Sequence, residues 1–299
     1  MKPVDFQLHR PATVDEAVAA LAGSQDSKAL AGGQSLVPLL NFRLARPAHV
    51  VDLGRLTELS AITRTPEAVR VGAMVRQAYA ERSRAVGADC PLLAAALPNV
   101  AHPPIRSRGT VGGSVAHADP SAEIPAVAMA LDAEMVVAGP GGRRTIAAAD
   151  FFVTQLVTTL APDELLLEVV FPRARPRTGA AVCEVARRQG DFALAGVAAQ
   201  VTLAEGGEVE DARICFIATG DRLARCREAE RTLVGDAPAP AAFEAAGEAA
   251  RAVLDPPTDL HATASYRRDV AGTLLARALR EAAERATRSS DAPEQEPAA

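Results

Sequence analysis

Two short stretches that each contain adjacent glycines limit what this chain can fold into. They are AGGQSL at residues 31–36 and RGTVGGSVAHADPSAE at residues 108–123. Glycine allows positive φ and has no Cβ to keep a ligand away, so successive backbone amides can point inward around an anion. The hydroxyls of Ser35 and Thr110 add donors, and hydrogen bonds to charged groups are each worth about 1.5–3 kcal/mol. Together the two stretches predict a ligand with two phosphates, held from both sides.

The alternatives to a ligand site are ordinary ones. A single glycine pair is more often a plain turn, so the prediction depends on both stretches being present. No lysine follows either pair, which excludes the nucleoside-triphosphatase loop G-x-x-x-x-G-K-[ST]. Neither stretch fits G-x-G-x-x-G, so the Rossmann fingerprint is absent as well.

Composition excludes several classes of protein. The chain has 299 residues, which favours two or three domains, and 48% of them are hydrophobic while only 3% are aromatic. The core must therefore be built mainly from Ala, Val and Leu. A formal net charge of −5 and the shortage of aromatic rings argue against nucleic-acid binding.

Cysteine spacing and hydropathy give further expectations. Four cysteines stand at positions 90, 183, 215 and 226, without metal-ligand spacing, so we expect no metal site in this chain. The N-terminal residues have no apolar signal-peptide core, and no run of eighteen apolar residues occurs. We expect a cytoplasmic protein with reduced thiols and no membrane span.

Periodicity predicts a chain of alternating helices and strands. Thr13 and Glu16 form a capping box before a helix, and the basic, proline-containing segment RARPRTG predicts a linker. We place one domain at 1–175, with subdomains at about 1–55 and 56–175, and a second domain at 176–285. The second domain is expected to be an antiparallel three-stranded meander followed by helices at about 221–234, 240–254 and 262–286. We expect a disordered tail at 286–299.

Several polar and aromatic residues near the glycine stretches are candidates for ligand contacts. Asp119 and Glu123 can accept hydrogen bonds from ribose or ribityl hydroxyls, although acids at such positions commonly cap helices. His102 flanks the second stretch, and a lone loop histidine is usually just solvated. In RRQGDFALAGVAA, Asp191 belongs to a turn and Phe192 either joins the core or covers a planar ring.

Four segments of the sequence resemble one family. AGGQSLVPLLNFRLARPAHVVDL, IRSRGTVGGSVAHADPSAEIPA, RRQGDFALAGVAA and SYRRDVAGTLLARAL occur in the order that is typical of the FAD-binding medium subunits of the molybdenum hydroxylases. This family includes subunits of xanthine dehydrogenase and of aerobic carbon monoxide dehydrogenase. The resemblance covers roughly residues 4 to 283.

The resemblance implies an α+β fold. It would comprise a vanillyl-alcohol-oxidase (PCMH)-type FAD-binding domain of two α/β subdomains and a C-terminal domain with a three-stranded antiparallel sheet and a helical bundle. It further implies non-covalent FAD between the two domains. The residues that the resemblance assigns to the cofactor are Ala31, Gly32, Gly33, Gln34, Ser35, Leu36, His102, Thr110, Gly112, Gly113, Ser114, Asp119, Glu123, Leu166, Asp191 and Phe192.

The resemblance also implies a function. The chain would be an electron-transfer flavoprotein subunit of an oxidoreductase, with no catalytic residue of its own. A small subunit would carry two two-iron two-sulfur clusters, and a large subunit would carry molybdopterin. Electrons would pass from the clusters to FAD and then to a quinone, O₂ or NAD, within a dimer of heterotrimers. Two alternatives are a stand-alone FAD-dependent oxidase or reductase of the same fold superfamily, and a nucleotide-binding protein without catalytic activity.

Overall fold

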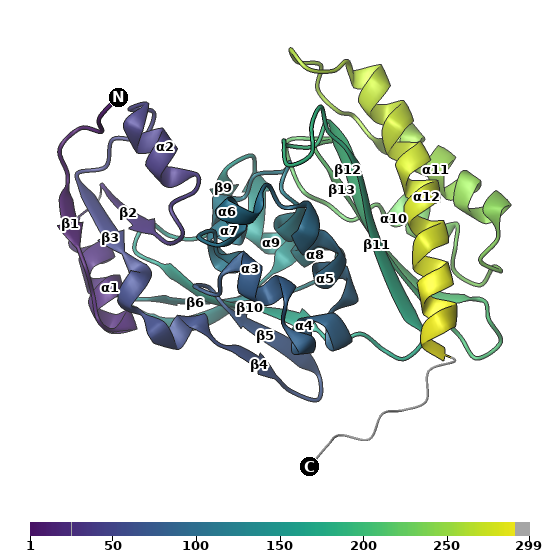
Figure 1. Ribbon diagram of the computed structural model, residues 1–299, viewed down its shortest axis with the longest axis horizontal. Coiled ribbons are helices and arrows are strands. Elements are labelled where there is room, and N and C mark those ends of the chain that lie inside the picture. Colours follow the sequence, from purple (N-terminus) through teal and green to yellow (C-terminus); the bar gives the residue numbers. More distant parts are fainter. Residues whose placement is uncertain (25, 291–299) are drawn as a thin grey trace.

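The N-terminal part of the computed structural model, which describes residues 1–24 and 26–290, is a small parallel sheet (Figure 1). Its strand order is β1–β3–β2, and the strands are Gln7–His9 (β1), Ser27–Leu30 (β2) and His49–Asp52 (β3). Its helices are α1 (Val14–Ala22), α2 (Leu36–Asn41), η1 (Leu53–Arg55) and η2 (Thr57–Ser60). The predicted cap at Thr13 is confirmed, because its hydroxyl accepts from the amide of Glu16 at 3.2 Å. Glu16 also reaches back, but its carboxylate accepts from the amide of Ala12, one residue before the cap, at 2.7 Å.

The second sheet is antiparallel, with strand order β4–β5–β10–β6–β7. Its strands are Ile62–Arg64 (β4), Ala68–Gly72 (β5), Glu134–Gly139 (β6), Gly142–Ala147 (β7) and Leu165–Pro172 (β10). The chain between β5 and β6 forms short helices: Gln77–Glu81 (α3), Arg84–Asp89 (α4), Pro91–Ala96 (α5), Leu97–Asn99 (η3), Pro103–Arg106 (α6), Val111–His117 (α7) and Glu123–Ala130 (α8). Helix α9 (Ala148–Phe151) and a small hairpin of β8 (Phe152–Thr154) and β9 (Val157–Thr158) precede β10.

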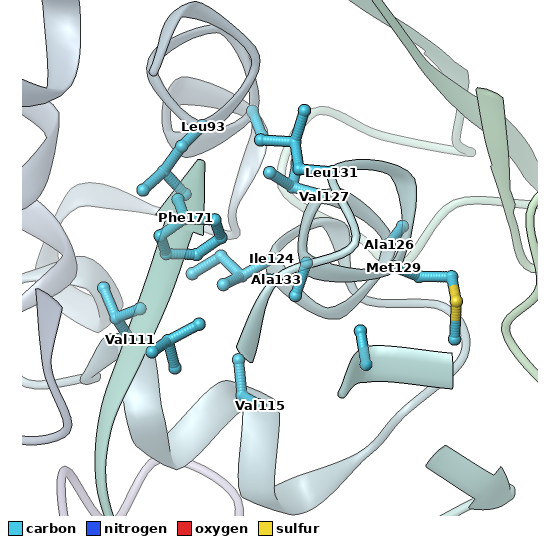
Figure 2. Packing of buried hydrophobic residues seen from close by; sticks show 14 of the residues in the cluster. Leu93, Val111, Val115, Ile124, Ala126, Val127, Met129, Leu131, Ala133 and Phe171 are labelled. Atoms are coloured by element: carbon cyan, nitrogen blue, oxygen red, sulfur yellow. The ribbon is translucent and has the colours of Figure 1, made fainter. Parts of the chain in front are cut away.

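The core of this region lies between β10 and three of the helices. Figure 2 shows Phe171 of β10 among Leu93 of α5, Val111 of α7 and Ile124 of α8. All four side chains are fully buried. Helix α8 is buried along its whole length, so its polar first residue, Glu123, is exceptional there. The apolar packing therefore fixes α7, which carries the second glycine pair, and α8, which begins with Glu123.

The C-terminal region is a three-stranded antiparallel meander covered by helices, as predicted. The strands are Thr178–Val185 (β11), Ala195–Leu203 (β12) and Val209–Ile217 (β13). The helices are Arg227–Arg231 (α10), Pro240–Val253 (α11) and Ala264–Ser290 (α12). Helices α11 and α12 lie on one face of this sheet, and α5 and α8 lie on the other (Figure 1).

The face of the meander toward α5 and α8 completes the core of the preceding region. Ala180, Ala198 and Ile217 belong to the same apolar cluster as Leu93 and Ile124. The opposite face forms a separate cluster with α11 and α12. Residues 173–177 link β10 to β11, and we propose the domain boundary there, although the apolar packing continues across it.

Helix α12 lies directly against β11 at Gly179. A methyl group at this position would overlap the carbonyl oxygen of Ala282 in the helix backbone. The same helix anchors the sheet end through Arg267, whose guanidinium donates to the carbonyl of Ala218 at 3.1 Å and to that of Leu194 at 2.5 Å. The late motif SYRRDVAGTLLARAL therefore has a structural role in holding the ends of β12 and β13.

An ion-pair network also joins the two regions. Arg225 binds the buried carboxylate of Glu230 at 2.8 Å and contacts Asp132, which follows α8. The side chains of Arg225 and Glu230 are each 6% exposed. Glu230 also accepts from the amide of Ile214 in β13 at 2.9 Å. Because both charges are buried, each depends on the other for compensation.

The structure departs from two sequence expectations. The helix expected at about 221–234 is only Arg227–Arg231, because Arg225 pairs with Cys215 as a β-bridge and the amide of Cys226 donates to Ile214. Helix α12 continues to Ser290, so the first residues of the tail expected to be disordered at 286–299 are helical. Residues 291–299 of that tail lie outside the described residues.

Two further findings concern membranes and thiols. Among the residues that the structure describes, no helix is both long and apolar enough to cross a membrane. All four cysteines are free thiols with buried side chains.

Candidate functional site

The first glycine stretch forms the connection from β2 to α2. Gly33 has a φ of +75°, so this bend uses the conformational freedom of glycine as predicted. The side-chain amide of Gln34 donates to the carbonyl of Gly32 at 3.0 Å and stabilises the bend. The backbone amides of residues 32–35 donate no hydrogen bond to any residue that the structure describes. Four adjacent unpaired donors are therefore available to an acceptor from outside the chain.

The second glycine stretch is helical, which corrects the prediction of a second bend with free amides. Thr110 is the N-cap of α7, and its hydroxyl accepts from the amide of Gly113 at 3.0 Å. The amides of Val111 and Gly112 donate to the carbonyls of Val75 and Ala73, at 3.0 and 3.1 Å. Thr110 is only 2% exposed, and the bond from Gly113 leaves the donor proton of its hydroxyl unassigned. The glycine at 112 is required because a Cβ there would lie 2.5 Å from Ala73.

The two stretches lie side by side. A methyl group at Gly32 would overlap the carbonyl oxygen of Arg108 and would lie 2.7 Å from the Cα of Gly109. On the other side of the contact, a Cβ at Gly113 would be 3.4 Å from the Cβ of Ala31. The absence of a side chain at position 32 thus permits the close contact between the stretches, whereas a Cβ at position 113 would conflict with the hydroxyl of Thr110, at 2.6 Å. The half-buried Ser114, one residue further, has no side-chain hydrogen bond within the described part of the chain.

The acids after the second stretch occupy different environments. Asp119 accepts from the amide of Ser121 at 2.9 Å and forms a turn, while the carbonyl of Pro120 accepts from Ala218 at the end of β13. Glu123 begins α8 and is 7% exposed. Burial, with the charge of Glu184 as a smaller cause, raises the pKa of Glu123 to about 7. Glu123 is therefore a buried acid whose ionisation is disfavoured near neutral pH.

The nearby cation does not neutralise Glu123. Arg106 is buried and paired with Glu81 at 2.9 Å. Its guanidinium also donates to the carbonyl of Val100 at 2.9 Å and to that of Ala101 at 3.2 Å. The partners of Arg106 are thus within the protein.

The segment RRQGDFALAGVAA includes the connection from β11 to β12. Gly190 has a φ of +84°, and a Cβ there would overlap the imidazole ring of His102. His102 therefore contacts this connection, which brings the region before α6 together with the C-terminal sheet. Phe192 is 68% exposed, so it is not part of the core. The amide of Asp191 donates to the carbonyl of Arg188 at 3.2 Å, as expected for a turn.

Leu166 differs from the other predicted residues. It lies in β10, where the pairing with β6 shifts register between Leu166 and Glu168. Its side chain is 4% exposed and belongs to the main apolar core. Only its backbone is therefore suited to contact a ligand. Leu36, the last predicted residue of the first stretch, begins α2 and is half-buried.

One residue of interest was not predicted. Glu184, near the end of β11, has a side-chain oxygen, Oε2, that is buried without a partner among the described residues. Burial raises its pKa to about 7. Side chains along a strand point to opposite faces in turn, so Glu184 lies on the same face as Ala180 and Val182. The face of the strand on which Glu184 lies could be predicted from the sequence, but the surface against which that face packs could not.

Comparison with known proteins places this geometry in a family. Residues 4–174 match the model of the FAD binding domain in molybdopterin dehydrogenase, which spans more than half of the chain. The chain belongs to this family. Residues 180–282 match the model of the CO dehydrogenase flavoprotein C-terminal domain. The family membership and the α+β fold predicted from the sequence are thereby confirmed.

Relatives in this family are subunits of dehydrogenase complexes. The chain is 41% identical to the alpha subunit of the 6-hydroxypseudooxynicotine dehydrogenase complex of Paenarthrobacter nicotinovorans, covering 96% of this chain and 97% of that protein. It is 38% identical to the carbon monoxide dehydrogenase medium chain of Hydrogenophaga pseudoflava, covering 93% and 97%. The chain is thus an oxidoreductase subunit of the FAD-binding type.

Solved structures of the family agree with this fold. Carbon monoxide dehydrogenase of Hydrogenophaga pseudoflava matches with a TM-score of 0.92 at 39% identity, covering 95% of this chain and 99% of that one. Quinoline 2-oxidoreductase of Pseudomonas putida 86 matches with a TM-score of 0.91 at 36% identity, covering 96% and 99%.

Proposed function

We propose that this chain is the FAD-carrying electron-transfer subunit of a heterotrimeric molybdenum hydroxylase. The unpaired amides of residues 32–35, beside the second stretch, are the observation that carries the proposal, because they fit the diphosphate of FAD. The cofactor supplies the two-electron and one-electron chemistry, as flavins do. The chain binds and orients it, and no residue of this chain is required as a general base.

The site residues have different proposed roles. The amides of Gly32 to Ser35 and the hydroxyls of Ser35 and Ser114 would bind the phosphates. Thr110, Gly112 and Gly113 would position the second stretch through the cap of α7. On the other side, His102, Asp191 and Phe192 would border the ring at the β11–β12 connection, together with the backbone of Leu166. Asp119 and Glu123 would face the hydroxyl-bearing chain between these ends.

The partners are part of the same proposal. The relatives are named as subunits of larger complexes, which supports a small subunit with two two-iron two-sulfur clusters and a large subunit with molybdopterin. We propose a dimer of such heterotrimers, located in the cytoplasm. Electrons would enter from the clusters and leave to a quinone, O₂ or NAD. Co-purification of the three chains, with metal and flavin analysis, tests this assembly, and a flavin-loaded chain that oxidises a substrate alone would contradict it.

Replacing two hydroxyls tests the phosphate site. Neither Ser35 nor Ser114 makes a side-chain hydrogen bond within the described residues, so Ser35→Ala and Ser114→Ala should leave the melting temperature unchanged. Each should raise the Kd for FAD about tenfold, because each removes a hydrogen bond to a charged group. Quenching of flavin fluorescence on binding measures the Kd. Ser60→Ala, at an exposed serine outside the site, is the control, and unchanged FAD affinity in both site variants would contradict the assignment.

A further inference from the structure

Glu184 and Glu123 approach the same boundary from two different regions. Along β11, Ala180 and Val182 pack against the core that contains α8, whereas Ala181 and Cys183 pack toward α12. By this alternation Glu184 faces the α8 side of the sheet. The register places it beside Gly196 of β12, and Gly196 is in turn beside Ile217, which belongs to the α8 core.

The space for the Glu184 side chain is created by glycine. A Cβ at Gly196 would lie 3.0 Å from the Cβ of Glu184, which is closer than ordinary packing allows. The connection between α7 and α8 is held to the same sheet by the hydrogen bond from Ala218 to Pro120, at 2.9 Å. Glu123 lies three residues after Pro120, at the first position of α8. Both residues therefore lie at the boundary where α8 packs on the C-terminal sheet, and the charge of Glu184 acts on Glu123.

Neither carboxyl is neutralised. Glu123 is nine-tenths buried and forms no hydrogen bond or ion pair with another side chain in the described chain. Glu184 has one buried oxygen without a partner. The charged groups that act on Glu123 are Glu184 of β11, Asp119 before α8 and Arg106 of α6. Two of these three are acidic, and Arg106 is already paired with Glu81.

Such a cluster holds a proton more readily than a cation. In the described part of the chain, no three acidic, histidine or cysteine side chains are arranged as metal ligands. Burial raises the pKa of each carboxyl to about 7, and for Glu123 the charge of Glu184 adds to the effect of burial. Two interacting acids titrate as a pair, so one proton is shared between them near neutral pH.

We propose that Glu123 and Glu184 share one proton across the domain boundary and that FAD binds together with this proton. The inference rests on the proposed function, because Glu123 lies in the proposed FAD site. A bound FAD brings two negative phosphates and covers the carboxyls, and both effects disfavour ionisation of the pair. The protein should therefore take up a proton from solvent as FAD binds above neutral pH. Below neutral pH the pair already holds that proton.

The sign of the pH dependence follows from this linkage. Above about pH 7 the Kd for FAD should rise, by up to tenfold for each pH unit when one proton is linked. Below about pH 6 it should be nearly constant. In Glu184→Gln this rise should be smaller, because one of the two titrating carboxyls is lost. It should be abolished only when Glu123→Gln is added, because Glu123 itself stays buried.

Calorimetry on the purified full-length chain tests the linkage. FAD is titrated at about pH 7.5 in two buffers of different ionisation enthalpy, which gives the number of protons taken up per FAD. The wild type should take up a large fraction of one proton, Glu184→Gln clearly less, and the Glu123→Gln/Glu184→Gln double variant close to none. Glu210→Gln is the matched control, because Glu210 is exposed at the far end of the same sheet. It should behave like the wild type.

A second measurement tests the pair without FAD. Infrared spectra of the FAD-free chain between about pH 6 and pH 8 should contain a protonated-carboxyl band that titrates near pH 7. Glu184→Gln and Glu123→Gln should each remove or shift it, and Glu210→Gln should not. An unaltered band in both site variants, or proton uptake equal in wild type and Glu184→Gln, would overturn the inference. Failure of FAD to bind at any pH would instead contradict the proposed function, while the infrared result still decides the pair.

Discussion

Gly32→Ala should reduce the affinity for FAD by about a hundredfold or more while the protein stays folded. The added methyl group would overlap the backbone of Arg108 and Gly109, and backbone atoms cannot move aside as a flexible side chain can. The first bend must then separate from the second stretch. A displacement of about 1 Å in a positioning element is enough for losses of this size.

The measurement is flavin content after purification together with the Kd from fluorescence titration. Gly87→Ala makes the same chemical change at an exposed helical glycine with no atom within 4 Å of the new Cβ. It should bind FAD normally and be slightly more stable, because alanine favours helix more than glycine does. Gly32→Ala protein that keeps stoichiometric flavin would exclude the proposed role of this bend.

Arg225→Ala should lower the free energy of unfolding by about 3–5 kcal/mol, because it leaves the buried carboxylate of Glu230 without its partner. It also removes the contact with Asp132 across the two regions. Urea unfolding followed by circular dichroism measures the loss. A melting temperature lower by roughly 10 °C should accompany it.

Two further variants separate charge burial from simple truncation. Arg225→Met combined with Glu230→Gln removes both charges and keeps an acceptor for the amide of Ile214, so it should cost less than Arg225→Ala alone. Arg231→Ala removes an ion pair whose arginine side chain is 73% exposed, and it should change stability by less than about 1 kcal/mol. A loss below about 1 kcal/mol in Arg225→Ala would refute the importance of this network.

Most of the fold could be predicted because its signals are local. The cap at Thr13, the meander after the linker and the bend at Gly33 depend on residues close together in the sequence. The helix near 221–234 was predicted too long because residues 225 and 226 pair with β13, and tertiary pairing overrides helix propensity.

The candidate site was predicted less completely, since glycine has more than one use. The second stretch was predicted to offer free amides, but its glycines allow close packing on Ala73 and on the first stretch. The sequence left open whether Phe192 joins the core or covers a planar ring, and the structure shows that it is exposed and outside the core. Glu184 was missed because its environment arises from contact with α8, about sixty residues earlier in the chain.

The apolar cluster that runs from α5 and α8 into the C-terminal sheet has a consequence for modular exchange. Recombination at residues 173–177 would separate the two domains, and each would then expose the apolar surface that normally packs against the other. A chimaera built at this junction from two relatives would need matched contact surfaces on both parents. In evolution and in protein design, the two domains should therefore change together, even though only a short connector joins them.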